Sequence, residues 1–147
     1  MEKEKQTPKP IISLRGYTID NLQYATSNKA DGSVPEGFKL TPTVAITEDL
    51  HQGKLSLDVS LRSVKNPGNH SSVSKTILIT ITAFFAISDE LTSKEEIGKS
   101  LAINGTAIVF PYVRSIVSMI TGLDSEQTIL LPTIRTKDLF SDSSIEI

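Results

Sequence analysis

Cysteine is absent from this chain of 147 residues, and histidine occurs only twice. Without cysteine the chain can form no disulfide, no thiolate nucleophile and no cysteine-based zinc site. His51 and His70 both lie in predicted turns, and their spacing does not fit two zinc ligands on one helix. We therefore expect both histidines to be solvated turn residues rather than bases or ligands. We expect the protein to need no metal and no cofactor.

An excess of positive charge is also missing. The chain has 15 lysine and arginine residues against 17 aspartate and glutamate residues, which gives a formal net charge of −2. The cations are scattered and form no basic stripe. This distribution argues against nucleic acid as a partner.

The sequence likewise lacks the motifs of common enzyme classes. It has no glycine-rich phosphate loop and no Gly-x-Ser-x-Gly turn. Its carboxylate pairs fall in a turn, at a strand end and in the first turn of a helix: Glu48-Asp49, Asp89-Glu90 and Glu95-Glu96. Solubility and interaction with the helix dipole explain these pairs. We therefore expect a binding protein rather than an enzyme.

Long apolar runs are absent as well. The longest, residues 107–113, contains Pro111 and is much shorter than the ~20 residues of a membrane-spanning helix. Residues 1–10 are rich in charge and have no apolar region typical of a secretory signal. We expect a cytoplasmic protein without direct membrane insertion. It would have a disordered tail over residues 1–10, one domain over 11–140 and a loose C-terminal end over 141–147.

The chain does contain clear strand signals. Apolar and polar residues alternate over residues 12–24, 38–47, 55–62 and 76–87. In the first of these the alternation shifts by one residue after Asp20, which indicates a β-bulge. Pro42 lies on the apolar face of the second, so we expect that strand to lie at an edge or to be broken there. The short turns favour a four-stranded antiparallel meander with one covered face.

A helical pattern follows the strands. Ser93 and Glu96 fit a capping box, so we expect a helix to begin there. Residues 104–106 should break or re-cap this helix, and Pro111 should start or kink the next one. We expect Gly122 to be its C-cap.

The second helical segment, from residue 107 to 122, has only a narrow polar face, so most of its surface is apolar and must be buried. Burial on a sheet covers one side only, so the other side must meet another segment or another subunit. We therefore predict a homo-oligomer. The predicted interface stripe consists of Val109, Val113, Ile116, Val117 and Ile120. Arg114 lies on the polar side, where we expect an ion pair or backbone contacts that fix the helix; simple solvation is the alternative.

Several apolar side chains exceed the needs of one small core. They lie on the polar face of the fourth strand, on the helix and near the C-terminus: Leu78, Phe84, Tyr112, Leu139 and Phe140. As a group they suggest a groove for extended apolar segments. The alternative is that each closes the core or a subunit interface.

The segment 104–121 resembles the main-helix motif of the SecB chaperone family, centred on Phe-Pro-Tyr-x-Arg, here Phe110 to Arg114. Four shorter segments are similar in the same order: Tyr17–Asp20, Phe84–Ile87, Leu131-Pro132 and Leu139-Phe140. The resemblance covers roughly residues 11–140.

The resemblance implies an α+β fold, in which a four-stranded antiparallel meander packs against one long C-terminal helix plus a short terminal helix or tail. It implies dimers or tetramers that bind unfolded polypeptides or preproteins without ATP. Many members of the family deliver preproteins to the SecA motor, and others protect an antitoxin. Asp20 matches an acidic position that the family uses toward the motor, with an exposed strand-end aspartate as the alternative.

The chain also departs from the family pattern. It has Ile134-Arg135 after the Leu-Pro segment, where the export chaperones tend to have Asn-Phe. It ends soon after Phe140, where the export family has a segment that contributes to motor docking. These departures weigh against motor delivery more than against client binding. Three functions stay open: a general or export chaperone, a dedicated partner of an antitoxin, and a small-ligand or enzymatic domain on the same scaffold.

Overall fold

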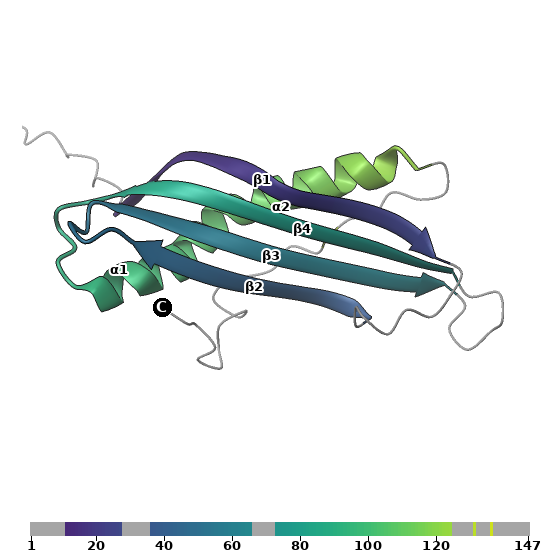
Figure 1. Cartoon of the computed structure of the whole chain (residues 1–147), viewed down its shortest axis with the longest axis horizontal. Helices are drawn as coiled ribbons and strands as arrows, with labels where there is room; N and C mark the ends of the chain where they lie inside the picture. Colours follow the sequence, from purple (N-terminus) through teal and green to yellow (C-terminus); the bar gives the residue numbers. More distant parts are fainter. Residues whose placement is uncertain (1–10, 28–35, 66–72, 125–130, 132–135, 137–147) are drawn as a thin grey trace, which may run out of the picture.

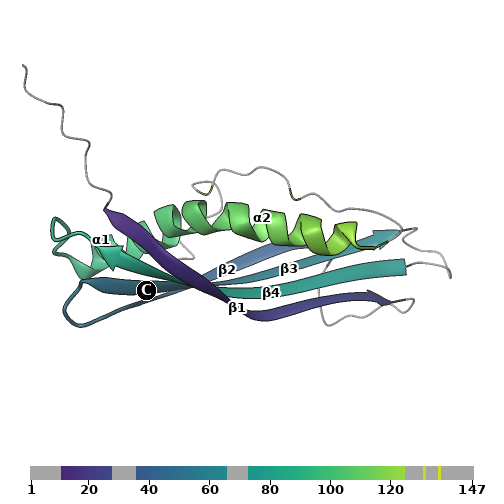
Figure 2. The same ribbon diagram turned by 90° about the horizontal axis from the view of Figure 1, so that it is seen from above.

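The computed structural model describes residues 11–27, 36–65 and 73–124, together with Leu131 and Thr136. Four strands come first: β1 (Ile12–Ser27), β2 (Gly37–Ile46), β3 (Gln52–Lys65) and β4 (Val73–Ile87). A long helical segment follows, made of α1 (Lys94–Ser100), a π-helical turn (Leu101–Gly105) and α2 (Thr106–Gly122). The described elements form two layers, with the helices lying along one face of a twisted sheet (Figures 1 and 2). The expected tails and the short terminal helix at Leu139 and Phe140 lie outside the described residues.

All four strands pair antiparallel, in the order β1-β4-β3-β2. Strands β2, β3 and β4 form the predicted meander, but β1 pairs with β4 rather than with β2. The simple meander order was therefore wrong for one strand. The physical reason lies in β4, whose inward side chains are buried along its whole length and need a neighbouring strand on both sides. Strand β2, with Pro42, is an edge strand, as predicted.

Strand β1 contains two irregularities, because its register with β4 shifts between Leu14 and Gly16 and again between Ile19 and Asn21. The second shift confirms the bulge predicted at Asp20. The first, at Arg15, was missed, although the apolar alternation also changes phase between Leu14 and Tyr17. Each shift inserts one residue that has no direct partner on β4.

The helical segment is continuous over the 29 residues Lys94–Gly122, so the break predicted at residues 104–106 does not occur. Ser93 caps its start, as predicted, by accepting a hydrogen bond from the backbone N–H of Glu96. Gly105 instead serves close packing: a Cβ there would lie 3.1 Å from Leu55 Cδ2 and 3.4 Å from Phe85 Cζ. The chain thus uses glycine where the helix approaches the sheet.

Two further helix predictions need correction. Pro111 does not start a helix; it lies exposed inside α2, and the alternative, a kink at this position, stays a prediction. Gly122 is the last helical residue, and the cap is Leu123, which has a right-handed φ of −76°. No left-handed glycine cap forms, because the residue after Leu123, Asp124, is held by side chains of the sheet.

The core fills the space between the helix and the inner face of the sheet. Its fully buried members from the strands include Leu55, Leu57, Ile81 and Phe85, and those from the helices include Ile97, Leu101, Val109, Val113 and Val117. Leu131, beyond the helix, is buried in the same cluster. By length and composition alone the helix could cross a membrane. The core helix of a soluble protein meets the same criterion, and this packing explains its apolar character.

One buried group in this core lacks a partner. Thr106 is completely buried, yet its Oγ1 atom forms no hydrogen bond. Thr121, equally buried in the same helix, donates a hydrogen bond from its hydroxyl to the backbone carbonyl of Val117 at 2.7 Å. A buried hydroxyl without a partner is destabilising.

We therefore predict that Thr106→Val raises the free energy of unfolding by about 1 kcal/mol, because it removes an unsatisfied hydroxyl and keeps the side-chain volume. Urea unfolding followed by circular dichroism measures the change. Thr121→Val is the matched control, and it should be neutral or destabilising by about 1 kcal/mol because it loses a formed hydrogen bond. A Thr106→Val protein less stable than the wild type would contradict this account of Thr106.

Candidate functional site

An uncovered apolar surface lies along β1 and the neighbouring flank of α2. On β1, Tyr17, Ile19 and Leu22 pair with Ala83, Ile81 and Ile79, which are buried on the helix side of the sheet. Their side chains therefore point to the helix side, but all three are exposed. On α2 the matching stripe has the spacing of one helix face: Tyr112, Ile116, Met119 and Leu123. We call these seven residues the β1–α2 face.

The two halves of this face meet at an aromatic contact. The rings of Tyr17 and Tyr112 have centroids 5.0 Å apart and are tilted by 38°. The exposed fraction rises towards the end of the helix, from 42% at Tyr112 to 68% at Met119 and 81% at Leu123. Singly exposed apolar side chains are ordinary, whereas a continuous strip of them indicates a surface that another molecule covers.

The five residues of the predicted oligomer interface fall into two groups in the structure, three that are buried and two that are partly exposed. Val109, Val113 and Val117 are completely buried against the chain's own sheet, so they have no surface left to offer a second subunit. Ile116 and Ile120 are partly exposed. The interface assignment thus stays a prediction for these two. Met119 and Leu123 are more exposed and were not among the predicted interface residues. The spacing of residues 112, 116, 119 and 123 on one helix face would have revealed them.

One end of the β1–α2 face is held by a cluster of polar side chains. Lys75 of β4 is 6% exposed, and its Nζ lies 2.7 Å from Oδ2 of Asp124. The hydroxyl of Tyr24 on β1 donates a hydrogen bond to the same oxygen at 2.7 Å. The cluster ties β1, β4 and the residue after the helix together. The sequence contained no local signal for it, because Lys75 and Asp124 are far apart in the chain.

Two side chains that bind Asp124 in this cluster have raised pKa values. The ion pair with Asp124 raises the pKa of Lys75 above its ordinary 10.5. Burial, followed by the hydrogen bond to Asp124, raises the pKa of Tyr24 above 10.0. The contacts join β1, β4 and the residue that follows the helix, and we assign the cluster a structural role on this geometry.

The outer face of the sheet, opposite the helix, is polar and carries a network of hydroxyl groups. Thr82 and Thr18 both donate to the Asp20 carboxylate, at 2.5 and 2.8 Å, and these bonds lower the pKa of Asp20, with a smaller contribution from Lys54. Asp20 is exposed, so the carboxylate is held in place but remains accessible from the solvent.

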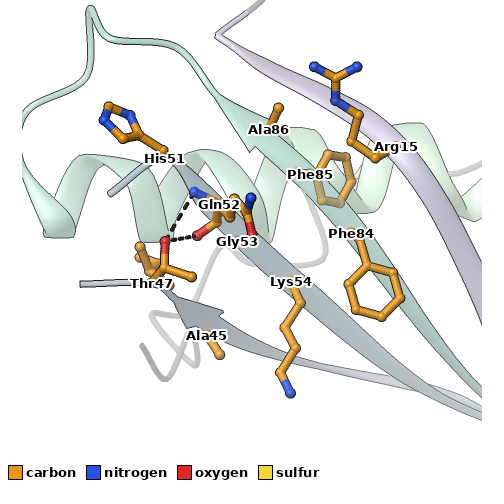
Figure 3. A pocket seen from close by; sticks show the side chains of 11 residues that line it. Arg15, Ala45, Thr47, His51, Gln52, Gly53, Lys54, Phe84, Phe85 and Ala86 are labelled. Atoms are coloured by element: carbon orange, nitrogen blue, oxygen red, sulfur yellow. Dashed lines mark hydrogen bonds between the residues drawn. The ribbon is translucent and has the colours of Figure 1, made fainter. Parts of the chain in front are cut away.

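Phe84 interrupts this polar surface. It is 44% exposed and lines an open hollow of about 590 Å³ at one end of the outer face (Figure 3). Gly16 of β1 and Lys54 of β3 are its register partners. The residues lining the hollow come from all four strands and from the turn between β2 and β3: Arg15, Ala45, Ile46, Thr47, His51, Gln52, Gly53, Lys54, Phe84, Phe85 and Ala86.

The predicted client-binding residues do not form one groove within a single chain. Leu78 lies on the outer face like Phe84, but in a separate hollow with Asn21, Lys39 and Asp58, about 20 Å along β4 at ~3.3 Å per residue. Tyr112 lies on the opposite side of the sheet, in the β1–α2 face. Leu139 and Phe140 fall outside the described residues.

Arg114 is half-buried, and its Nε atom is buried without a hydrogen-bond partner. Among the described residues it forms no ion pair, so its stabilising role stays a prediction. His51 lies in a turn, as expected, with Nδ1 3.3 Å from an exposed carboxylate oxygen of Asp89. Within the described ranges, no three side chains of the ligating types come together to hold a metal ion.

Several solved structures share this fold, including the following two. One is the Mycobacterium tuberculosis Rv1957 SecB-like chaperone in complex with a ChAD peptide from the Rv1956 HigA1 antitoxin, at a TM-score of 0.65 and 18% identity, over 84% of this chain and 90% of that one. The other is a protein of unknown function from Streptococcus agalactiae, at a TM-score of 0.51 and 13% identity, over 83% of this chain and 97% of that one. No family model matches the chain, and no curated protein matches its sequence. The SecB-like α+β fold predicted from the helix motif is confirmed.

The polar cluster at the end of the helix gives a testable pH dependence. Because the pKa of Lys75 is raised in the folded protein, its contribution to stability is complete below pH 10.5 and is lost as the pH rises through the folded value. Tyr24, with a raised pKa, acts in the same direction above pH 10.0. Asp124→Asn should lower the melting temperature at pH 7 by roughly 5 °C, since it leaves a buried ammonium without its counter-charge.

Melting curves between pH 7 and 11 provide the measurement. The wild type should lose stability above pH 10 more steeply than Asp124→Asn does. Asp89→Asn is the control, because the contact of Asp89 with His51 is exposed and contributes little. Equal melting temperatures of Asp124→Asn and wild type at pH 7 would show that the cluster does not hold the helix end.

Proposed function

We propose that the protein is a molecular chaperone that binds non-native polypeptides without ATP. The observation that carries this proposal is a SecB-like fold whose large apolar side chains remain exposed on both sides of the sheet, at the β1–α2 face and at Phe84. The likeness to a chaperone bound to a peptide supports a polypeptide ligand. It supports a non-enzymatic role in the same way, and we place that role in the cytoplasm.

Non-native segments suit these surfaces for a physical reason. Extended chains expose alternate apolar side chains that would be buried after folding. Contact with an exposed aromatic group such as Phe84 covers these side chains. Each Å² of apolar surface buried in this way contributes about 25 cal/mol of binding free energy before ordering costs are subtracted. Those costs are large for a disordered client, so several contacts must act together. This requirement favours an oligomer that presents several copies of each surface.

We further propose that two copies of the chain associate through the β1–α2 face. Strand β1 is an edge strand, so its outward backbone groups have no partner strand among the described elements. A twofold arrangement would place the same exposed strip against itself and extend the sheet across the interface. Client contacts would then fall to Phe84 and Leu78 on the outer face, whereas Tyr112, which belongs to the shared strip, would be covered in the interface.

Two biological roles fit a chaperone of this kind. The antitoxin peptide bound by the Mycobacterium tuberculosis neighbour favours a dedicated chaperone of one client, such as an antitoxin. An export role would require contact with the SecA motor, for which Asp20 on the outer face is the candidate. Purification from the native cytosol with identification of bound polypeptides separates the two roles, because a dedicated chaperone would retain one dominant client.

We predict that the protein suppresses aggregation of a chemically denatured model protein when present at stoichiometric amounts, without nucleotide. Phe84→Ser should weaken the suppression several-fold, because it removes an exposed aromatic contact and leaves the core intact. Ile11→Ser is the matched control, since Ile11 is 42% exposed and Phe84 44%. Light scattering of the client measures the effect. Absence of suppression by the wild type would reject a general chaperone and favour the single-client role.

We also predict that the wild-type protein is an oligomer and that Met119→Glu dissociates it at micromolar concentration. Met119 is 68% exposed in the single chain, so a glutamate there is tolerated by the fold but costs desolvation in an interface. Thr43→Glu, at an exposed position on the outer face of β2, should leave the mass unchanged. Multi-angle light scattering that finds a monomeric wild type, or an unaltered Met119→Glu oligomer, would contradict the assigned interface.

A further inference from the structure

The hollow around Phe84 has a charge pattern that the proposed chaperone function does not explain. It lies on the outer face of the sheet, on the side away from the helix and the β1–α2 face. Arg15 from β1 and Lys54 from β3, the two strands that flank β4, line the same hollow as Phe84 (Figure 3). An exposed aromatic ring and two cations in one hollow are a combination that apolar client binding alone does not need.

The first bulge of β1 is what brings Arg15 to this position. The register passes from Leu14, opposite Phe85, to Gly16, opposite Phe84, with Arg15 as the inserted residue. Bulges re-aim side chains, and here the inserted side chain lines the outer hollow. Arg15 is exposed and has no ion-pair partner among the described residues.

The nearby carboxylates do not cancel this positive charge. Asp20 interacts with Lys54, and that interaction contributes to the lowered pKa of Asp20. Asp89 lies beside His51, and Asp49 accepts hydrogen bonds from the Thr47 hydroxyl and the His51 backbone N–H. None of these three carboxylates lines the hollow, and the titratable residues that do line it are Arg15, Lys54 and His51. The local field therefore favours an anionic ligand next to Phe84.

The shape of the hollow favours an extended chain. Its lining crosses all four strands, a width of about 14 Å at ~4.8 Å between neighbouring strands. An extended segment of four or five residues has the same length at about 3.3 Å per residue. Above Gly16 there is open space, because a Cβ built there meets no atom within 4 Å. A side chain of a ligand can therefore lie beside the Phe84 ring.

We propose that this hollow binds an extended acidic peptide segment, with an aromatic residue on Phe84 and carboxylates two residues before and two residues after it. In an extended chain these three side chains point the same way, towards Arg15, Phe84 and Lys54. This proposal rests on the proposed function only in taking a polypeptide as the ligand. Inorganic phosphate would use the cations but would leave the exposed ring of Phe84 uncovered. A single-stranded nucleic acid can stack a base on such a ring, so an oligonucleotide is tested as a competitor.

The test uses short fluorescein-labelled peptides and the intact full chain. The acidic probe contains Glu-Ser-Phe-Ser-Glu, the neutral probe Gln-Ser-Phe-Ser-Gln and the basic probe Lys-Ser-Phe-Ser-Lys. Fluorescence anisotropy should show the acidic probe binding about five- to tenfold more tightly than the neutral one at low salt, as two exposed ion pairs permit. The preference should shrink as salt is added, and replacing phenylalanine by serine in the acidic probe should weaken binding further.

Variants locate the site. Arg15→Glu should abolish the preference for the acidic probe, whereas Lys39→Glu, the same change of charge at an exposed position on the outer face of β2 outside this hollow, should retain it. Equal affinities for the acidic and neutral probes would overturn the proposal, and so would loss of preference in both variants. If a single-stranded oligonucleotide competes as strongly as the unlabelled acidic peptide does, the hollow binds polyanions in general, and the proposal of an acidic peptide ligand is overturned. Aggregation suppression is measured in parallel to separate failure of this proposal from failure of the proposed chaperone function. If the protein suppresses aggregation but shows no preference for the acidic probe, only the proposed acidic-peptide site is rejected.

Discussion

The structure depends on covering a four-stranded apolar sheet face with a single helix. A helix with its side chains is about 10 Å wide, whereas four strands span about 14 Å between their axes. The helix crosses the sheet obliquely, with α1 beside β2 and the end of α2 tied to β1 (Figure 1). Strands β3 and β4 in the centre are fully covered, and the strip along β1 is not. The β1–α2 face is thus a geometric consequence of the fold, and the proposed self-association supplies its missing cover.

Close packing between helix and sheet imposes the next constraint. Gly53 and Gly105 mark where the two layers come nearest, since a Cβ on Gly53 would lie 2.6 Å from Leu101 Cδ1. The π-helical turn at Leu101–Gly105 lies at the same place. In the sequence the pair Asn104-Gly105 is typical of a helix end, and it predicted one. Tertiary packing outweighed this local preference, because the residues on both sides of the glycine bury large side chains that a broken helix would leave exposed.

The sequence predicted the features that depend on local periodicity. The four strands, the edge position of β2, the bulge at Asp20 and the cap at Ser93 all follow from neighbouring residues. The placement of β1 beside β4 and the Lys75–Asp124 pair depend on residues far apart in the chain, for which one sequence carries no signal. Phe84 was predicted as a binding residue from its polar neighbours, and the structure places it in a hollow. Its neighbour Arg15 was missed because its bulge was missed.

The two sides of the sheet can act independently, for structural reasons. On the helix side, the cluster of Tyr24, Lys75 and Asp124 fixes the end of α2 against β1, so the apolar strip is presented in one arrangement, and a pre-ordered surface binds at a lower entropic cost. On the outer side, both bulges of β1 place a charged residue towards solvent, Arg15 at the Phe84 hollow and Asp20 in the hydroxyl network. Strand β1 thus contributes apolar side chains to one surface and charges to the other. A second copy covering the β1–α2 face would leave the outer face accessible, and one assembly could therefore bind an acidic segment there while its subunits remain associated.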